Sequence, residues 1–188
     1  MPPKAKVSKE DIIKAAVQIV RENGSGGLNA RRIVKKLNCS TQPIFSNFKS
    51  MEELKSEVLS YAAKVYKSYQ EGFIKSGEYP AYKAIGMGYI KFAKEQSELF
   101  KFLFMRDRRY DKSDDPIDND FENAVSIVMK STGLSRDDAS VFHMEMWAFT
   151  HGIATILATS FLDIDYDTVS RMLKDQFEGL KATFKKER

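Results

Sequence analysis

The stretch NARRIVKKLNCSTQPIFSNFK, residues 29–49, decides the fold of this chain. Asn29 has the side chain of a helix N-cap, and a short helix is predicted from it to Leu37. The two residues that follow leave room only for a tight turn. Ser40 is then expected to cap another short helix, where Pro43 fits because first-turn amides have no intrahelical partner to lose. Two short helices joined by about three residues form the helix-turn-helix pattern. Their expected buried side chains are Ile33, Val34, Leu37, Ile44 and Phe48.

Longer helices are predicted on both sides of this pattern. The capping box Ser8-Lys9-Glu10-Asp11 begins a helix whose apolar residues recur at helical spacing, and Asn23-Gly24 ends it. A second capping box, Ser50-Met51-Glu52-Glu53, begins a long helix to about Lys75. We therefore expect a three-helix head in residues 1–50 and a second domain in residues 51–188.

The remainder of the chain is predicted to be a helical bundle, so the fold class is all-α. The periodic segments cover about 79–95, 97–105, 117–131, 136–161 and 167–185, and a capping box at Ser135 precedes the fourth of them. The stretch from Arg106 to Asn119 is charged, contains a proline, and is expected to be a mobile loop. No strand signal and no internal repeat is present.

Composition narrows the class of protein. Hydrophobic residues make up 43% and charged residues 30% of the 188, as in ordinary globular proteins. No apolar run is long enough for a membrane span, and the polar start is unlike a secretory signal, so a cytoplasmic location is expected. One cysteine and two histidines favour neither a disulfide nor a metal site. No phosphate loop or nucleophile elbow is present, so neither an enzyme nor a cofactor is expected.

The charge of the chain is divided unevenly. Residues 1–50 hold ten lysines and arginines against three acids, a net charge of +7, whereas residues 51–188 hold twenty against twenty-three, a net charge of −3. A basic head binds phosphates through counterion release, and an acidic body does not compete for the same DNA. The pattern therefore favours double-stranded DNA as a partner of the head.

Residues 12–54 resemble the DNA-binding domain of the tetracycline-repressor (TetR) family. The matching positions are Ile12, Ala15-Ala16, Asn23-Gly24, Leu28-Asn29, Arg31, Ile33, Leu37, Ser40, Phe45, Phe48-Lys49 and Leu54. The chain departs from the family's usual residues at Asn29 (threonine), Val34 (alanine), Asn38 (glycine), Phe45 (tyrosine) and Met51 (a basic residue). In the body, Trp147-Ala148-Phe149-Thr150-His151-Gly152 is similar to a tryptophan, histidine and glycine signature of one branch of the family.

The N-terminal residues of a recognition helix reach base edges in the major groove, and Gln42 suits adenine while Pro43 and the Thr41 methyl suit thymine. Arg31 is expected to contact either guanine or phosphate. Backbone contacts are expected from Lys4, Lys6, Lys9, Lys35, Lys36 and Lys49. The predicted DNA-binding residues are Asn29, Arg31, Ser40, Thr41, Gln42, Pro43, Phe45, Ser46, Asn47 and Lys49.

The resemblance implies a small-molecule effector bound in the body, and the aromatic and methionine content favours an apolar or aromatic one. The candidate residues are Tyr61, Val65, Tyr89, Phe92, Phe104, Trp147 and His151. Trp147 and His151 share a helix face, for which core packing is an alternative to ligand contact.

The resemblance also implies a homodimer formed by the last two long helices. Small side chains suited to close helix packing are Ala148, Gly152, Thr155, Ala158 and Thr159. The leading hypothesis is a repressor released from a palindromic operator by its effector. The alternatives are a DNA-binding regulator without an effector, and a small-molecule binding protein with a vestigial head.

Overall fold

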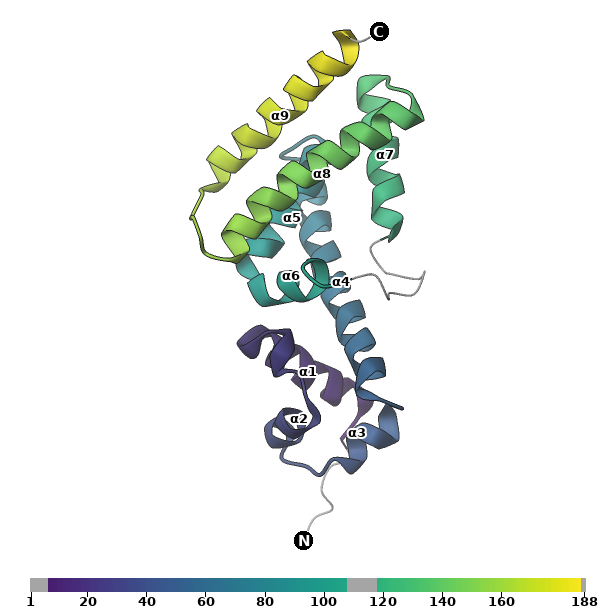
Figure 1. Ribbon diagram of the computed structural model, residues 1–188, viewed down its shortest axis with the longest axis vertical. Helices are drawn as coiled ribbons and strands as arrows, with labels where there is room; N and C mark the ends of the chain where they lie inside the picture. The colour runs from purple at the N-terminus through teal and green to yellow at the C-terminus, as the bar shows by residue number, and fades with distance from the viewer. Residues whose placement is uncertain (1–6, 108–117, 187–188) are drawn as a thin grey trace. The chain divides into compact units, whose positions relative to one another are not determined.

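The computed structural model describes residues 7–107 and 118–186, and all regular structure in these residues is helical (Figure 1). The all-α prediction is confirmed. In chain order the elements are α1 Lys9–Asn23, a 3-10 turn at Ser25–Gly27, α2 Ala30–Leu37, α3 Gln42–Asn47, α4 Met51–Ser76, α5 Ala81–Glu95, α6 Ser97–Phe104, α7 Asp118–Thr132, α8 Arg136–Ala158 and α9 Tyr166–Lys186.

These helices form two compact units. The head unit comprises the described residues up to Lys64 together with Glu98–Arg106, and the body unit comprises Val65–Ser97 and the described residues from Asp107 onward. Helix α4 runs through the division without a break, and only Gln96 separates α5 from α6. The chain passes from one unit to the other at three places: inside α4 after Lys64, inside α6 after Ser97, and after Arg106. The first two of these places lie within helices.

The head unit is built as the capping residues predict. The Ser8 hydroxyl accepts the Asp11 amide at 3.1 Å, while the Asp11 carboxylate accepts the Ser8 amide at 3.0 Å, which completes the capping box of α1. The Asn29 side chain accepts the Arg32 amide at 3.0 Å and caps α2. Its buried core includes Ile12, Ala16, Val20, Ile33, Ile44, Phe48, Leu54 and Val58. Val34 and Leu37, predicted to be buried, are only half-buried.

The start of α3 differs from the prediction. The helix begins at Gln42 and its N-cap is Thr41, so the prediction that Ser40 caps it is wrong. Thr41 has a helical backbone (φ −75°, ψ −17°) and makes no side-chain capping bond, whereas a side-chain cap requires an extended backbone. Pro43 lies in the first turn, as expected.

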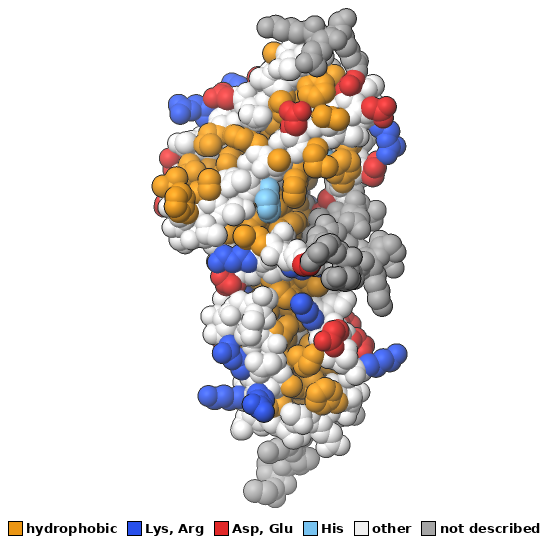
Figure 2. Space-filling model, in the orientation of Figure 1, with side chains coloured by type: hydrophobic (Ala, Val, Ile, Leu, Met, Phe, Trp, Pro, Cys, Tyr) orange, Lys and Arg blue, Asp and Glu red, His pale blue; other side chains and the backbone are white. Residues whose placement is uncertain are grey.

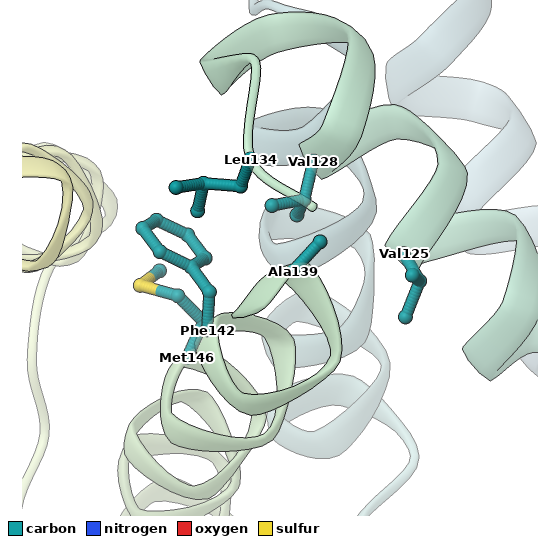
Figure 3. Packing of buried hydrophobic residues seen from close by; sticks show 6 residues of the cluster. All are labelled: Val125, Val128, Leu134, Ala139, Phe142 and Met146. Atoms are coloured by element: carbon teal, nitrogen blue, oxygen red, sulfur yellow. The ribbon is translucent and has the colours of Figure 1, made fainter. Parts of the chain in front are cut away.

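In the body unit, α7 and α8 share an apolar cluster (Figure 3), formed by Val125, Val128, Leu134, Ala139, Phe142 and Met146. Helix α9 adds Phe177 and Phe184, whose rings lie 5.1 and 5.7 Å from that of Phe142. Helix α8 begins at the predicted cap, where the Ser135 hydroxyl accepts the Asp138 amide at 3.2 Å, but it ends at Ala158, earlier than expected. Of the loop expected at 106–119, residues 108–117 lie outside the described residues. Asp118 and Asn119, at the end of the expected loop, belong to α7.

Helices α4 and α5 approach each other closely at Gly88. A Cβ atom added there would lie 2.7 Å from the Gln70 Cα and 3.0 Å from the Tyr69 carbonyl oxygen. Real Cβ atoms do not come this close to backbone, so only glycine fits. The contact holds two helices of the body unit together backbone to backbone.

Candidate nucleic-acid interface and ligand site

Helix α3 has one buried face and one exposed face. Ile44 and Phe48 are buried in the head core, whereas Gln42, Phe45 and Ser46, which share the opposite face, are exposed together with Thr41. The ring of Phe45 is 55% exposed, unusual for a large apolar side chain. The face therefore presents an amide, hydroxyls and an aromatic ring without any competing partner from the buried core.

Two of the predicted DNA-binding residues have their amide groups engaged within the head. The Asn47 side chain donates to the Pro43 carbonyl at 2.7 Å, and Asn29 is the cap of α2 and also donates to the Gly27 carbonyl at 3.3 Å. Both residues stabilise the helices that carry the exposed face. Ser40 is exposed and lies in the turn before α3.

The cations of the head fall into two groups. Lys9 pairs with Glu57 at 2.5 Å and Lys36 with Glu22 at 2.9 Å, so these two predicted phosphate contacts already have acidic partners. Among the described residues, Arg31, Lys35 and Lys49 are exposed and form no ion pair; Lys4 and Lys6 lie outside these residues. Figure 2 shows lysine and arginine side chains on the surface of this unit. The side chains best placed for phosphate are therefore those of Arg31, Lys35 and Lys49.

In the body unit, three of the predicted effector residues meet. The Tyr89 hydroxyl lies 2.8 Å from Nδ1 of His151, and the Trp147 ring stacks on the His151 ring with centroids 5.0 Å apart. Burial lowers the pKa of His151, which favours the neutral ring as the hydrogen-bond partner of the Tyr89 hydroxyl. The three residues therefore form a group with one hydrogen bond and one pair of stacked rings.

The other predicted effector residues lie in different surroundings. Phe92 is fully buried between the rings of Tyr66 and Tyr69, each with its centroid 5.7 Å away. Val65 is half-buried at the start of the body unit. Tyr61 and Phe104 are half-buried residues of the head unit.

A second tyrosine–histidine pair was not predicted. The Tyr82 hydroxyl lies 2.7 Å from Nδ1 of His143, and the Phe121 ring lies 4.9 Å from the histidine ring. Burial lowers the pKa of His143 to about 4. Tyr82 and Tyr89 are seven residues apart on α5, and His143 and His151 are eight apart on α8, both about two helical turns. The two spacings match, but they point to the pairs only once α5 is known to pack against α8.

An open groove lies between the C-terminal part of α4 and α5 in the body unit. Its volume is about 530 Å³, and it is lined by Ser68, Tyr69, Gly72, Phe73, Ser76, Glu78, Lys91 and Glu95. Two of these residues are bonded across it, since the Tyr69 hydroxyl donates to Glu95 at 3.0 Å. None of the predicted effector residues lines this groove.

The outer face of α8 carries large apolar side chains beside the exposed Glu145. Val141, Met144 and Trp147 are 52%, 52% and 42% exposed, and Phe161 and Leu162, which follow the helix in the chain, are exposed as well. Figure 2 shows hydrophobic side chains gathered over this part of the body. A Cβ atom at the exposed Gly152 would meet nothing within 4 Å. Of the predicted small residues, Ala148, Gly152 and Thr159 are exposed, while Thr155 is half-buried and Ala158 is buried.

The described residues contain no cluster of three or more His, Cys, Asp or Glu residues that could hold a metal ion. They also contain no helix with both the length and the apolar character that crossing a membrane requires.

Known structures share this fold over nearly the whole chain. A protein of unknown function from Rhodococcus sp. RHA1 superposes with a TM-score of 0.76 at 18% identity, covering 97% of this chain and 98% of that one. A TetR-like transcriptional regulator from the same organism gives 0.70 at 15%, covering 94% and 96%. A TetR family protein from Vibrio parahaemolyticus gives 0.65 at 16%, covering 90% and 96%. At such identities the likeness establishes the fold alone.

The family follows from the sequence of the body. A search among curated proteins finds no match to the chain. Residues 82–178, just over half of the chain, match the model of the tetracyclin repressor-like C-terminal domain. With the helix-turn-helix head that precedes this domain, the chain belongs to the TetR family of transcriptional regulators.

Proposed function

We propose that the protein is a homodimeric repressor that binds a palindromic operator and leaves it when a small molecule binds the body. The head would be residues 1–50 and the effector and dimerisation domain residues 51–188. The observation that carries the proposal is the exposed face of α3, with Gln42, Phe45 and Ser46 directed away from a well-packed core. Exposed polar and aromatic side chains on the second helix of a helix-turn-helix are what major-groove readout requires.

Within this proposal the DNA-binding residues divide by role. Thr41, Gln42, Pro43, Phe45 and Ser46 would meet bases, while Arg31 and Lys49 would meet the backbone or a flanking base. Asn29, Ser40 and Asn47 would act through the shape of the head, since two of them cap or tie helices and the third lies in the turn.

The dimer would form through the outer face of α8 together with α9. Exposed apolar patches on one face of a protein mark interaction surfaces, and the line Val141, Met144 and Ala148 leads to the open Gly152. A twofold axis would then present two heads to half-sites about one helical turn apart.

The effector is proposed to be an apolar or aromatic small molecule with a hydrogen-bonding group. Tyr89, Trp147 and His151 offer aromatic surface beside an imidazole, and Val65 and Phe92 of the same unit are the further candidate contacts. For release, the ligand must favour one arrangement of the helices over another. Helix α4 and the α5–α6 connection would carry this preference to the head unit, because Glu98 of α6 approaches Gly24 after α1.

Fluorescence anisotropy on the upstream DNA of the gene, against a scrambled duplex and across a salt series, tests the DNA-binding half of the proposal. We expect specific binding that weakens steeply with salt and is lost in Gln42→Ala. Gln18→Ala, at a half-buried position of α1 outside the helix-turn-helix, is the control for loss of a glutamine amide. Equal binding to both duplexes, unchanged by the Gln42 substitution, would refute a sequence-reading head.

The dimer and the effector need separate measurements. Gly152→Trp adds a large side chain to open space, so the subunit should fold, yet sedimentation velocity should show monomers. A dimer that survives this change would place the interface elsewhere.

A small molecule at 100 times its dissociation constant should stabilise the protein by about 2.7 kcal/mol and lower its affinity for the operator. Stabilisation without loss of operator affinity would contradict release.

A further inference from the structure

The recognition helix α3 carries no charged side chain. From Thr41 to Phe48 the sequence is TQPIFSNF, and the nearest cations along the chain are Lys35 and Lys36 of α2 and Lys49 after the helix. In the major groove, arginine and lysine are the side chains that pair best with guanine, and aspartate and glutamate accept from cytosine. None of these four is available on the exposed face of α3.

The side chains that are exposed suit the other base pair. Gln42 has the amide that binds both N6 and N7 of adenine, and the apolar surfaces of Phe45 and Thr41 suit the thymine methyl group. Gln42, Phe45 and Ser46 lie three and four residues apart, so they meet the same stretch of the groove. The Ser46 hydroxyl can form a hydrogen bond with either kind of base pair.

Phe45 cannot donate a hydrogen bond to a phosphate. Its ring is 55% exposed, and it has no hydroxyl with which to donate to a phosphate. Asn47, the other amide of the helix, is half-buried and donates to the Pro43 carbonyl at 2.7 Å, so Gln42 is the amide left to read adenine.

We infer that the bases read by α3 in each operator half-site are A·T pairs, with Gln42 on an adenine and Phe45 on a neighbouring thymine methyl. This inference rests on the proposed DNA-binding function. A guanine in the half-site would lie where Arg31 of α2 reaches, outside the bases that α3 covers.

Selection from a random duplex library, with wild type and Arg31→Ala in parallel, tests the inference. We expect half-sites from both proteins to share a core of A·T pairs. On the selected duplex, Gln42→Ala should reduce the preference for A·T over G·C at one core position by about 5- to 150-fold. A G·C core retained by the Arg31→Ala protein would overturn the inference while leaving DNA binding intact.

Replacing core thymines by uracil removes only the methyl group. We expect a loss of about fourfold in affinity for the methyl that Phe45 contacts, the value of one buried methyl-sized group. In Phe45→Ala, which should fold because the ring is exposed, the same replacement should have no effect. Uracil at a flanking thymine is the control. A loss that is equal in wild type and Phe45→Ala would overturn the role of Phe45, and enrichment of no sequence would refute the proposed function itself.

Discussion

Gly88→Ala tests the backbone contact between α4 and α5. The new methyl group would lie 2.7 Å from the Gln70 Cα and 2.9 Å from the Gln70 nitrogen. Both are backbone atoms in the middle of a 26-residue helix, so they cannot move aside as a flexible side chain would. Overpacking of this kind costs about 1–3 kcal/mol, while alanine gains about 1 kcal/mol in helix propensity over glycine. The net loss expected in the free energy of unfolding is up to about 2 kcal/mol.

Urea denaturation followed by circular dichroism measures this loss, and for a chain of this size it corresponds to a fall in melting temperature of about 4–8 °C. Gly72→Ala is the matched control, because Gly72 lies in α4 with nothing within 4 Å of an added Cβ. The control should gain up to about 1 kcal/mol. If Gly88→Ala proved as stable as its Gly72 counterpart, the two helices would not touch through their backbones.

Three further predictions concern two residues of the head, Gly24 and Asn29, and His143 of the body. Gly24→Ala should destabilise the protein by about 1–3 kcal/mol in urea denaturation, because Gly24 has φ +67° and ψ −178° and its added Cβ would lie 2.8 Å from Glu98 Oε2; an unchanged midpoint would contradict this. Asn29→Ala should cost about 0.5–2 kcal/mol through loss of the α2 cap, and Asn29→Thr should lose less, since threonine also caps; equal losses would show that the capping bond is unimportant. Stability should fall as the pH is lowered from about 6.5 to about 4, because His143 is neutral when folded (pKa about 4) but protonated when unfolded. In His143→Gln this dependence should be weaker by up to about 1.4 kcal/mol per pH unit, and an unchanged slope in urea denaturation would exclude His143 as its source.

The helix boundaries were predictable where a local signal sets them. Ser8, Asn29 and Ser135 each cap the helix predicted from them, since a cap involves only residues two or three positions away. The prediction that Ser40 caps α3 was wrong because the helix begins after Thr41, which has a helical backbone and makes no capping bond. No feature of the sequence distinguishes the two positions. The α3 residues that face outward were predicted because burial of Ile44 and Phe48 fixes the opposite side.

Contacts between distant residues were only partly predictable. Trp147 and His151 were expected on one face of a helix, but their meeting with Tyr89, 62 residues before His151, depends on how α5 packs against α8. The same holds for Tyr82 and His143. A tyrosine in one helix and a histidine in another carry no mark of pairing until the helices are placed side by side.

Gly88 and Tyr89, which are adjacent on α5, connect the stability of the protein with its proposed regulation. Tyr89, which bonds His151, directly follows Gly88, which touches the backbone of α4. A ligand that moves Tyr89 therefore acts on the residue next to a contact with no flexible side chain to absorb the movement. Helix α4 then continues without a break to Met51 in the head unit. Within the proposed function, Gly88→Ala should thus alter the response of operator affinity to the effector, and not stability alone.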